Sequence, residues 1–250
     1  MVPPEPEGGP LARGWCLWVL TALAGVVAAA FGVWFASGHS STRASQAASQ
    51  SAAPSPAGTP ACSVDFRDAG FGESDWRATT TGPTTLAVAT FTVESANQGG
   101  PDDGSYRTTH LVFAGTGLLS VLHLQRAGVY DPAACGRVTS IDASYRVQNR
   151  GEPRPVQVVA FAVRQGDAVY TAGRRGVDSS DWTPVNLTGL HETDLGLEAG
   201  TGPPHPDFSA GRMEFGYLTA NSCGLGAAAP PCAEYQTVSA IAAWQVLVHR

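Results

Sequence analysis

The chain has 250 residues, enough for one large domain or two small ones, and its 29 glycines and 18 prolines favour a turn-rich fold over a helical bundle. All 15 basic residues are arginines, and the net charge of -6 argues against nucleic-acid binding, which needs clustered cations. The one basic doublet, Arg174-Arg175, is flanked by Gly173 and Gly176, and we interpret it as a solvated turn.

Residues 15–36 form a stretch of 22 residues without a charge. As a helix, this stretch would cover roughly 33 Å, enough for the apolar core of a bilayer. Trp15, Trp18 and Trp34 lie near its ends, where interfacial aromatics are common. We therefore predict a single-pass anchor in the plasma membrane, with residues 1–14 as a short cytoplasmic tail and the remainder extracytoplasmic.

A cleaved signal peptide is the alternative, because Ala36-Ser37-Gly38 offers small residues for cleavage, and the protein would then be secreted. Cleavable apolar regions usually run about 7–15 residues, so the length favours a retained anchor. Orientation rests on Arg13, which flanks the span more closely than Arg43 does. Cys16 is expected to stay free in the bilayer.

Residues 37–61 are small and polar, with prolines at 54, 56 and 60. They cannot bury enough apolar area to offset the entropy of ordering, so we predict a flexible linker. The folded part is then residues 62–250.

In this part, apolar residues recur at every second position, the period of a half-buried strand. The pattern covers residues 141–148, 87–94, 213–217 and 244–248, whereas 156–163 is apolar almost throughout and fits a strand covered on both faces. Gly166 predicts a tight hairpin after that run. About ten strands and no amphipathic helix predict a sandwich or barrel.

Short motifs in residues 138–250 follow one another in a familiar order. They are Ala162-Val163-Arg164-Gln165-Gly166 with Tyr170, Asp181-Trp182-Thr183, Gly189-Leu190 with Asp194, Pro206-Asp207-Phe208-Ser209-Ala210, Phe215-Gly216-Tyr217 with Ala220-Asn221-Ser222, and Trp244-Gln245-Val246. The set resembles bacterial exported domains of the concanavalin A-like lectin/glucanase (laminin G-like jelly roll) superfamily. The resemblance implies a jelly-roll sandwich of two antiparallel sheets. Such domains often carry an acidic or amide residue before the last Trp, whereas Ala242-Ala243 stands here, which puts a polar role there in doubt.

Four of the five cysteines lie in the predicted domain, and an even number in an exported protein indicates disulfides. Of three connectivities we favour Cys223–Cys232 with Cys62–Cys135, since the first pair brackets a short Gly/Ala/Pro loop. Free thiols are the alternative, and the spacing does not suggest zinc.

Glu192, Asp194 and Glu198 invite comparison with glucanases of the superfamily, whose catalytic strand carries three acids in an acid–x–acid–x–x–acid pattern. Here the spacing is one residue too long, and the resemblance places the segment in a loop. Retaining hydrolysis needs two carboxyls about 5–5.5 Å apart. We therefore predict no catalytic residue.

No cofactor is predicted, although calcium is a candidate ligand for the loop residues Asp102, Asp103 and Asp131. His110 and His123 lie on predicted strands without a metal motif, and we interpret them as structural. No nucleophile or phosphate-binding motif occurs.

These features predict an all-β, two-sheet antiparallel jelly-roll sandwich, preceded by one transmembrane helix and a flexible linker. By analogy of fold, the functional prediction is a membrane-anchored extracytoplasmic lectin-like domain that binds a glycan or cell-surface component without catalysis. Tyr106, Tyr130 and Tyr145 are candidate sugar platforms, with core or edge packing as the alternative for each. The alternative functions are a glycoside hydrolase of the same fold and a structural or protein-interaction domain of the cell envelope. A concave sheet without exposed aromatics would favour the latter.

Overall fold

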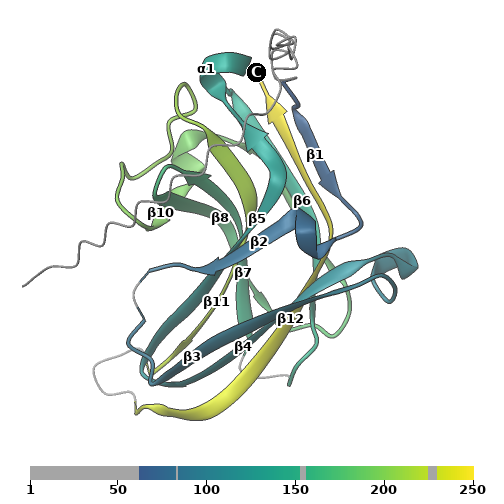
Figure 1. Cartoon of the computed structure of the whole chain (residues 1–250), viewed down its shortest axis with the longest axis vertical. Coiled ribbons are helices and arrows are strands. Elements are labelled where there is room, and N and C mark those ends of the chain that lie inside the picture. The colour runs from purple at the N-terminus through teal and green to yellow at the C-terminus, as the bar shows by residue number, and fades with distance from the viewer. Residues whose placement is uncertain (1–61, 83, 153–155, 225–229) are drawn as a thin grey trace, which may run out of the picture. The chain divides into compact units, whose positions relative to one another are not determined.

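The computed structural model describes residues 62–82, 84–152, 156–224 and 230–250, which form a sandwich of two six-stranded sheets (Figure 1). All strand pairs in the described residues are antiparallel, so the predicted all-β, two-sheet antiparallel sandwich is confirmed. No helix within these ranges is long and apolar enough to span a membrane. The predicted tail, anchor and linker, residues 1–14, 15–36 and 37–61, lie outside the described residues.

In both sheets the order of the strands in space differs from their order in the sequence. Sheet A has the order β3 (Val88–Ala96), β4 (Tyr106–Gly115), β12 (Cys232–His249), β6 (Ser140–Asn149) and β9 (Thr183–Leu190), with β1 (Asp65–Asp68) paired to β12. Sheet B has the order β10 (Gly196–Ala199), β8 (Ala168–Val177), β7 (Gln157–Gln165), β11 (Met213–Cys223), β5 (Gly117–Tyr130) and β2 (Trp76–Thr80). The helical turns are η1 (Glu73–Asp75), η2 (Pro101–Asp103), α1 (Pro132–Cys135) and η3 (Glu192–Asp194).

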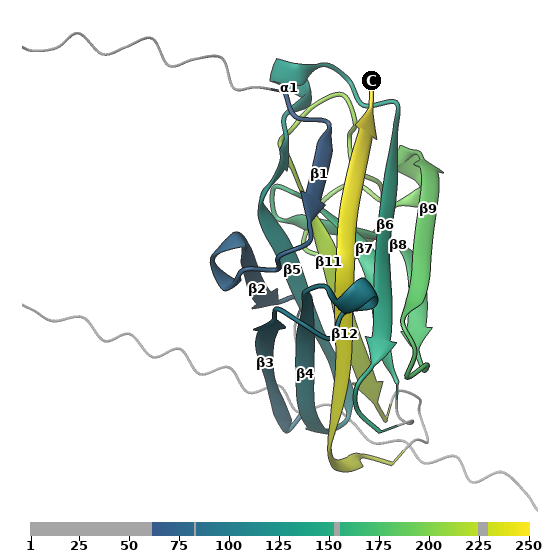
Figure 2. The ribbon, with the colours of Figure 1, turned by 90° about the vertical axis from the view of Figure 1, so that its right-hand side faces the viewer.

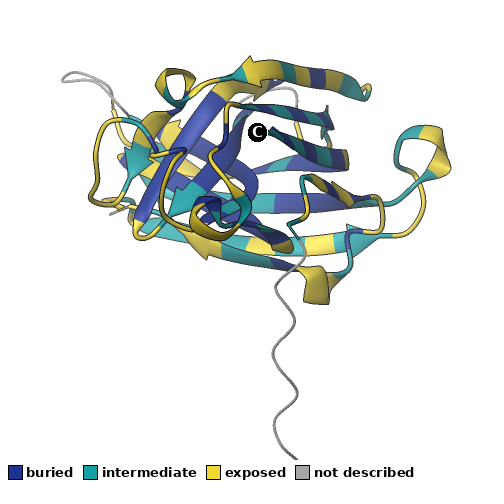
Figure 3. Ribbon diagram, turned by 90° about the horizontal axis from the view of Figure 1, so that it is seen from above, coloured by how far each residue is buried: buried dark blue, intermediate teal, exposed yellow. Residues whose placement is uncertain are grey.

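The core lies between the sheets and follows the predicted alternation. Met213, Phe215 and Tyr217 of β11 face Trp244 and Val246 of β12, and all five are at most 1 % exposed. Buried and less buried positions alternate along the strands, while turns are mostly exposed (Figure 3). Strand β7 is buried on both faces, as its nearly continuous apolar run predicts.

Strand β12 organises sheet A because it is long enough to pair with three strands (Figure 2). Its register shifts between Ala242 and Gln245, where Ala243 has a φ of 52°. The bulge leaves Trp244 directed into the core. The Ala242-Ala243 departure from the resemblance therefore coincides with a backbone irregularity of this strand.

Two glycines that look alike in the sequence have different roles. Gly166, with a φ of 61°, turns β7 into β8 as predicted. Gly173 also has a positive φ, 64°, but lies inside β8 opposite a register shift of β7. Arg174 and Arg175 are exposed, as the interpretation expects, but the predicted turn is wrong, because both residues lie within β8.

Both disulfides join the cysteines that the sequence analysis favours. Cys62–Cys135 ties the segment before β1 to α1, with Cα atoms 5.4 Å apart, and Cys223–Cys232 closes the connection between β11 and β12, at 5.9 Å. These separations are ordinary for disulfides.

Candidate functional site

The three acidic residues tested as catalytic candidates make separate local contacts. Glu192 accepts a hydrogen bond from the backbone N–H of Phe208 at 2.9 Å and lies 3.8 Å from the Arg137 guanidinium. Asp194, the last residue of η3, accepts from the backbone N–H of His191, the residue that precedes this turn. Glu198, on β10, pairs with Arg174 of β8. Each carboxylate is therefore engaged in holding a turn or a sheet edge.

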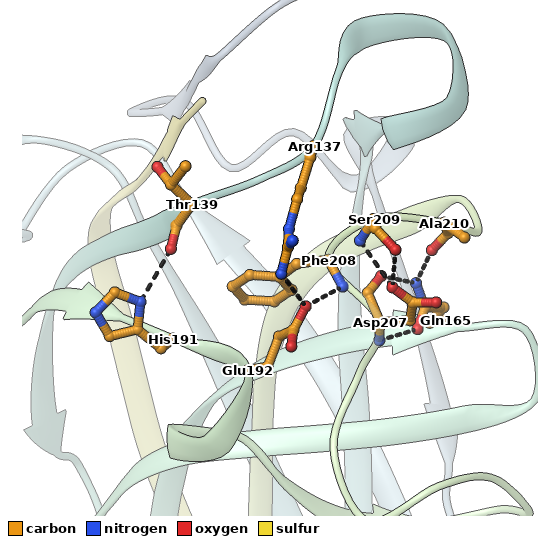
Figure 4. A network of polar contacts seen from close by, with 9 residues as sticks. All are labelled: Arg137, Thr139, Gln165, His191, Glu192, Asp207, Phe208, Ser209 and Ala210. Atoms are coloured by element: carbon orange, nitrogen blue, oxygen red, sulfur yellow. Dashed lines mark hydrogen bonds and ion pairs between the residues drawn. The ribbon is translucent and has the colours of Figure 1, made fainter.

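A cavity of about 350 Å³ adjoins Glu192, at the junction of the α1–β6 connection, η3 and the loop before β11 (Figure 4). Its floor includes the buried ring of Phe208, and Arg137, Thr139 and His191 line its sides. Nδ1 of His191 is hydrogen bonded to the carbonyl of Thr139 at 2.9 Å. The cavity lacks a second carboxylate among its described lining residues, so it does not offer the acid–base pair of a glycosidase.

A single glutamine and a single aspartate stiffen the loop beside this cavity. Nε2 of Gln165 donates to the carbonyls of Asp207 and Ala210, at 2.8 and 2.6 Å (Figure 4). Asp207 accepts from the hydroxyl and the backbone N–H of Ser209, and these hydrogen bonds hold the pKa of its carboxyl below the usual value. The Pro206–Ala210 motif of the sequence thus builds a compact turn.

The three calcium candidates are not brought together as a site. Asp131 caps α1 by accepting from the backbone N–H of Ala133, whereas Asp102 and Asp103 occupy η2 with φ angles of 55° and 60°. Of the residues that the structure describes, no group of three histidine, cysteine or acidic side chains could hold a metal ion.

The two histidines differ in environment. His123 is fully buried, and its Nε2 lies 3.3 Å from the Thr109 hydroxyl and 3.2 Å from that of Thr219. Burial, reinforced by the charge of Arg107, holds the pKa of His123 well below its usual value. His123 is therefore a neutral core residue, in agreement with the structural interpretation.

His110 instead lies on the outer face of sheet A. Its Nδ1 accepts from the amide of Gln236 at 2.9 Å, which leaves Nε2 directed toward Glu94, 3.9 Å away. It thus belongs to the surface next to Tyr106.

Of the three candidate platforms, only Tyr106 is at the surface. Tyr130 and Tyr145 are 1 % and 2 % exposed and pack in the core. Tyr106 begins β4 and is half-buried, with its side chain on the outer face of sheet A, since Leu111 and Phe113 at the opposite parity point inward.

Tyr106 belongs to an aromatic cluster with Trp182 and Arg150. The two rings meet edge to face, with centroids 5.9 Å apart, and the Arg150 guanidinium lies 4.0 Å from the Tyr106 centroid and 5.7 Å from that of Trp182. Sequence periodicity could not predict that these residues lie together, because they come from β4, the end of β6 and the turn before β9. The resemblance singled out Trp182 but gave it no role.

A groove of about 280 Å³ runs beside the aromatic cluster. Glu94, Thr108 and His110 line it together with Tyr106 and Arg150. An aromatic edge, a carboxylate, a hydroxyl and a guanidinium on a rigid sheet can together contact both the apolar and the hydroxyl faces of a sugar.

The outer face of sheet B is hollow, because one cavity of about 240 Å³ is lined from both edge strands, by Thr79 of β2 and Ala199 of β10. Leu122, Arg164 and Val169 lie between them. No aromatic side chain is among the described residues lining this cavity. The described lining of this cavity therefore offers no ring on which a sugar could stack.

Comparisons with known proteins give no family assignment. No family model and no curated protein match the sequence. Among solved structures, the chain is similar to CtCBM11, with a TM-score of 0.41 and 10% identity over 76% of this chain and 99% of the other. It is also similar to the C-terminal family 22 carbohydrate binding module of Clostridium thermocellum Xyn10B (0.40, 9%, 73% and 92%) and to an exo-beta-agarase (0.40, 11%, 74% and 25%). At this level of similarity, function has to be inferred from the residues of the chain itself.

Proposed function

We propose that the domain is a non-catalytic glycan-binding module whose binding surface is the outer face of sheet A at the aromatic cluster. The observation that carries the proposal is the packing of Tyr106 and Trp182 around Arg150 beside a groove with Glu94 and His110. The rings are held by the sheet and by Arg150, so little side-chain entropy remains to be lost on binding.

The wider setting is part of the same proposal. Residues 15–36 anchor the chain in the membrane, and residues 37–61 carry the domain away from the bilayer on the extracytoplasmic side. Supporting this are the length of the uncharged stretch and the disulfides of the domain, which are typical of exported proteins.

The test is retention of the full-length chain, purified in detergent, on immobilised β-glucan, chitin and peptidoglycan. The wild type should be retained, and Trp182→Ala or Tyr106→Ala should weaken retention about tenfold, the effect of one stacking contact. Leu197→Ala is the control, since it removes an exposed apolar side chain from sheet B. Retention that is unchanged in both aromatic variants would exclude this surface.

Reducing-end release is measured in the same incubations, and none is expected. Release that disappears in Glu192→Gln would establish the hydrolase alternative instead. The protein-interaction alternative is favoured by one observation, the hollow face of sheet B without aromatic lining residues. If the wild type is not retained on any of these glycans and cleaves none of them, the protein-interaction alternative replaces the proposed function.

A further inference from the structure

Arg150 is fixed in place although it is exposed and follows the end of β6. Its Nε donates to Oε1 of Gln148 at 2.7 Å, and its two terminal nitrogens donate to the Tyr106 hydroxyl at 3.0 Å and to the carbonyl of Gly99 at 2.9 Å. The guanidinium also lies over the Tyr106 ring. Gln148 is in turn held, because its amide donates to the carbonyl of Ser180 at 2.5 Å. An exposed arginine with these contacts is pre-organised.

The charge of Arg150 is not neutralised within the described part of the chain. Arg67, Arg77, Arg137, Arg164 and Arg174 all form ion pairs with carboxylates, but no described carboxylate forms one with Arg150. Three of its five N–H groups are used by neutral acceptors. Each terminal nitrogen therefore keeps one N–H for another partner.

We infer that the groove binds an acidic saccharide, and that Arg150 recognises the carboxylate of a uronic-acid-type sugar. The inference rests on the proposed function and specifies its ligand class. Two N–H groups on the terminal nitrogens of one planar guanidinium match the two oxygens of a carboxylate. The sugar ring then lies along the groove, where the exposed carboxylate of Glu94 is available to its hydroxyl groups.

Glu94 lies in the same groove and has the opposite effect on an anionic ligand. Its side chain is 73% exposed, and its carboxylate lies 3.9 Å from Nε2 of His110. Removing its charge should therefore strengthen the binding of an acidic polymer, whereas removing the charge of Arg150 should weaken it. This opposition separates ligand recognition from a purely structural role of Arg150.

The experiment compares retention of the full-length chain in detergent on polygalacturonate and on the same polymer with its carboxyl groups methyl-esterified. The wild type should prefer the free acid about tenfold or more. Arg150→Gln should abolish this preference, and Arg150→Lys should reduce it, since lysine keeps the charge but loses the planar pair of donors. Glu94→Gln should increase it. Arg126→Gln, which removes an exposed positive charge from sheet B, should leave it unchanged.

The outcomes separate this inference from the function on which it rests. Equal retention on both polymers, with loss in Trp182→Ala, would overturn the acidic ligand and leave the glycan-binding surface intact. Retention on dextran sulfate alone would replace the carboxylate by a sulfate ester and overturn the uronic-acid assignment. Absence of retention on every acidic and neutral polymer would remove both proposals. A lower affinity for the free acid in Glu94→Gln would also contradict the inference.

Discussion

Acidification should destabilise the domain through His123. The imidazole is fully buried between two threonine hydroxyls and stacked on Tyr217, with centroids 4.4 Å apart, and its pKa is well below the usual value because of burial. The unfolded chain therefore binds a proton near pH 6.5 that the folded chain does not. The contribution of the neutral imidazole to the free energy of unfolding is fully present above that pH and is lost as the pH falls below it.

The size of the effect follows from linkage. One proton taken up only by the unfolded state costs about 1.4 kcal/mol per pH unit well below pH 6.5, and about 2 kcal/mol between pH 7.5 and 5. The carboxyl groups of Asp65, Asp142 and Asp207 have lowered pKa values, so their stabilisation is lost only below about pH 4. Between pH 5 and 7.5 the titration of these carboxyl groups therefore does not contribute to the change in stability.

The assay is urea unfolding of the full-length chain, followed by tryptophan fluorescence at pH 7.5 and 5 and constant ionic strength. His123→Gln keeps a polar side chain without a titrating ring, and it should lose about 2 kcal/mol less than the wild type over this window. An equal loss in both proteins would refute the reasoning. If the variant does not fold, an NMR titration of the wild type replaces the unfolding experiment. A His123 ring that protonates above pH 6 in the folded protein would also refute the reasoning.

Three further predictions follow from the described residues and the sequence. Gly216→Ala should destabilise the domain by about 3 kcal/mol or more, because a Cβ would lie 1.8 Å from the carbonyl oxygen of the facing strand, whereas Gly166→Ala meets nothing within 4 Å and should cost about 1–2 kcal/mol by chemical denaturation. Removing Cys62–Cys135, which spans 73 residues, should cost about 4 kcal/mol, more than removing the bridge that spans 9, at about 3 kcal/mol; equal losses would contradict the loop-entropy argument. The full-length chain should sediment with membranes and become soluble without residues 1–38, whereas a mature N-terminus at residue 39 would show cleavage.

Period-two patterns predicted the strands because a strand that buries one face shows this alternation in its own residues. The alternation at Met213, Phe215 and Tyr217 identifies inward positions without knowledge of the partner strand, and all three lie in the core. The hairpin at Gly166 is similarly local, since a turn of positive φ needs only its own residues. The favoured disulfides likewise agree with the structure.

Local patterns failed where a partner strand decided the outcome. Gly173 has the same sign of φ as Gly166, but it lies within β8, opposite a register shift of β7. A sequence shows that a glycine permits this φ, and only the neighbouring strand shows whether the chain turns back or continues.

The candidate site depended entirely on tertiary structure. Tyr106 was one of three equivalent tyrosines in the sequence, and the packing of the two sheets buried Tyr130 and Tyr145 while leaving Tyr106 at the surface. Trp182 and Arg150 join it because antiparallel pairing brings the end of β6 beside the start of β9, and because the carbonyl of Gly99 and the side chains of Gln148 and Tyr106 fix the guanidinium. Periodicity tells which side of a strand a residue occupies, whereas the register between strands decides which side chains meet.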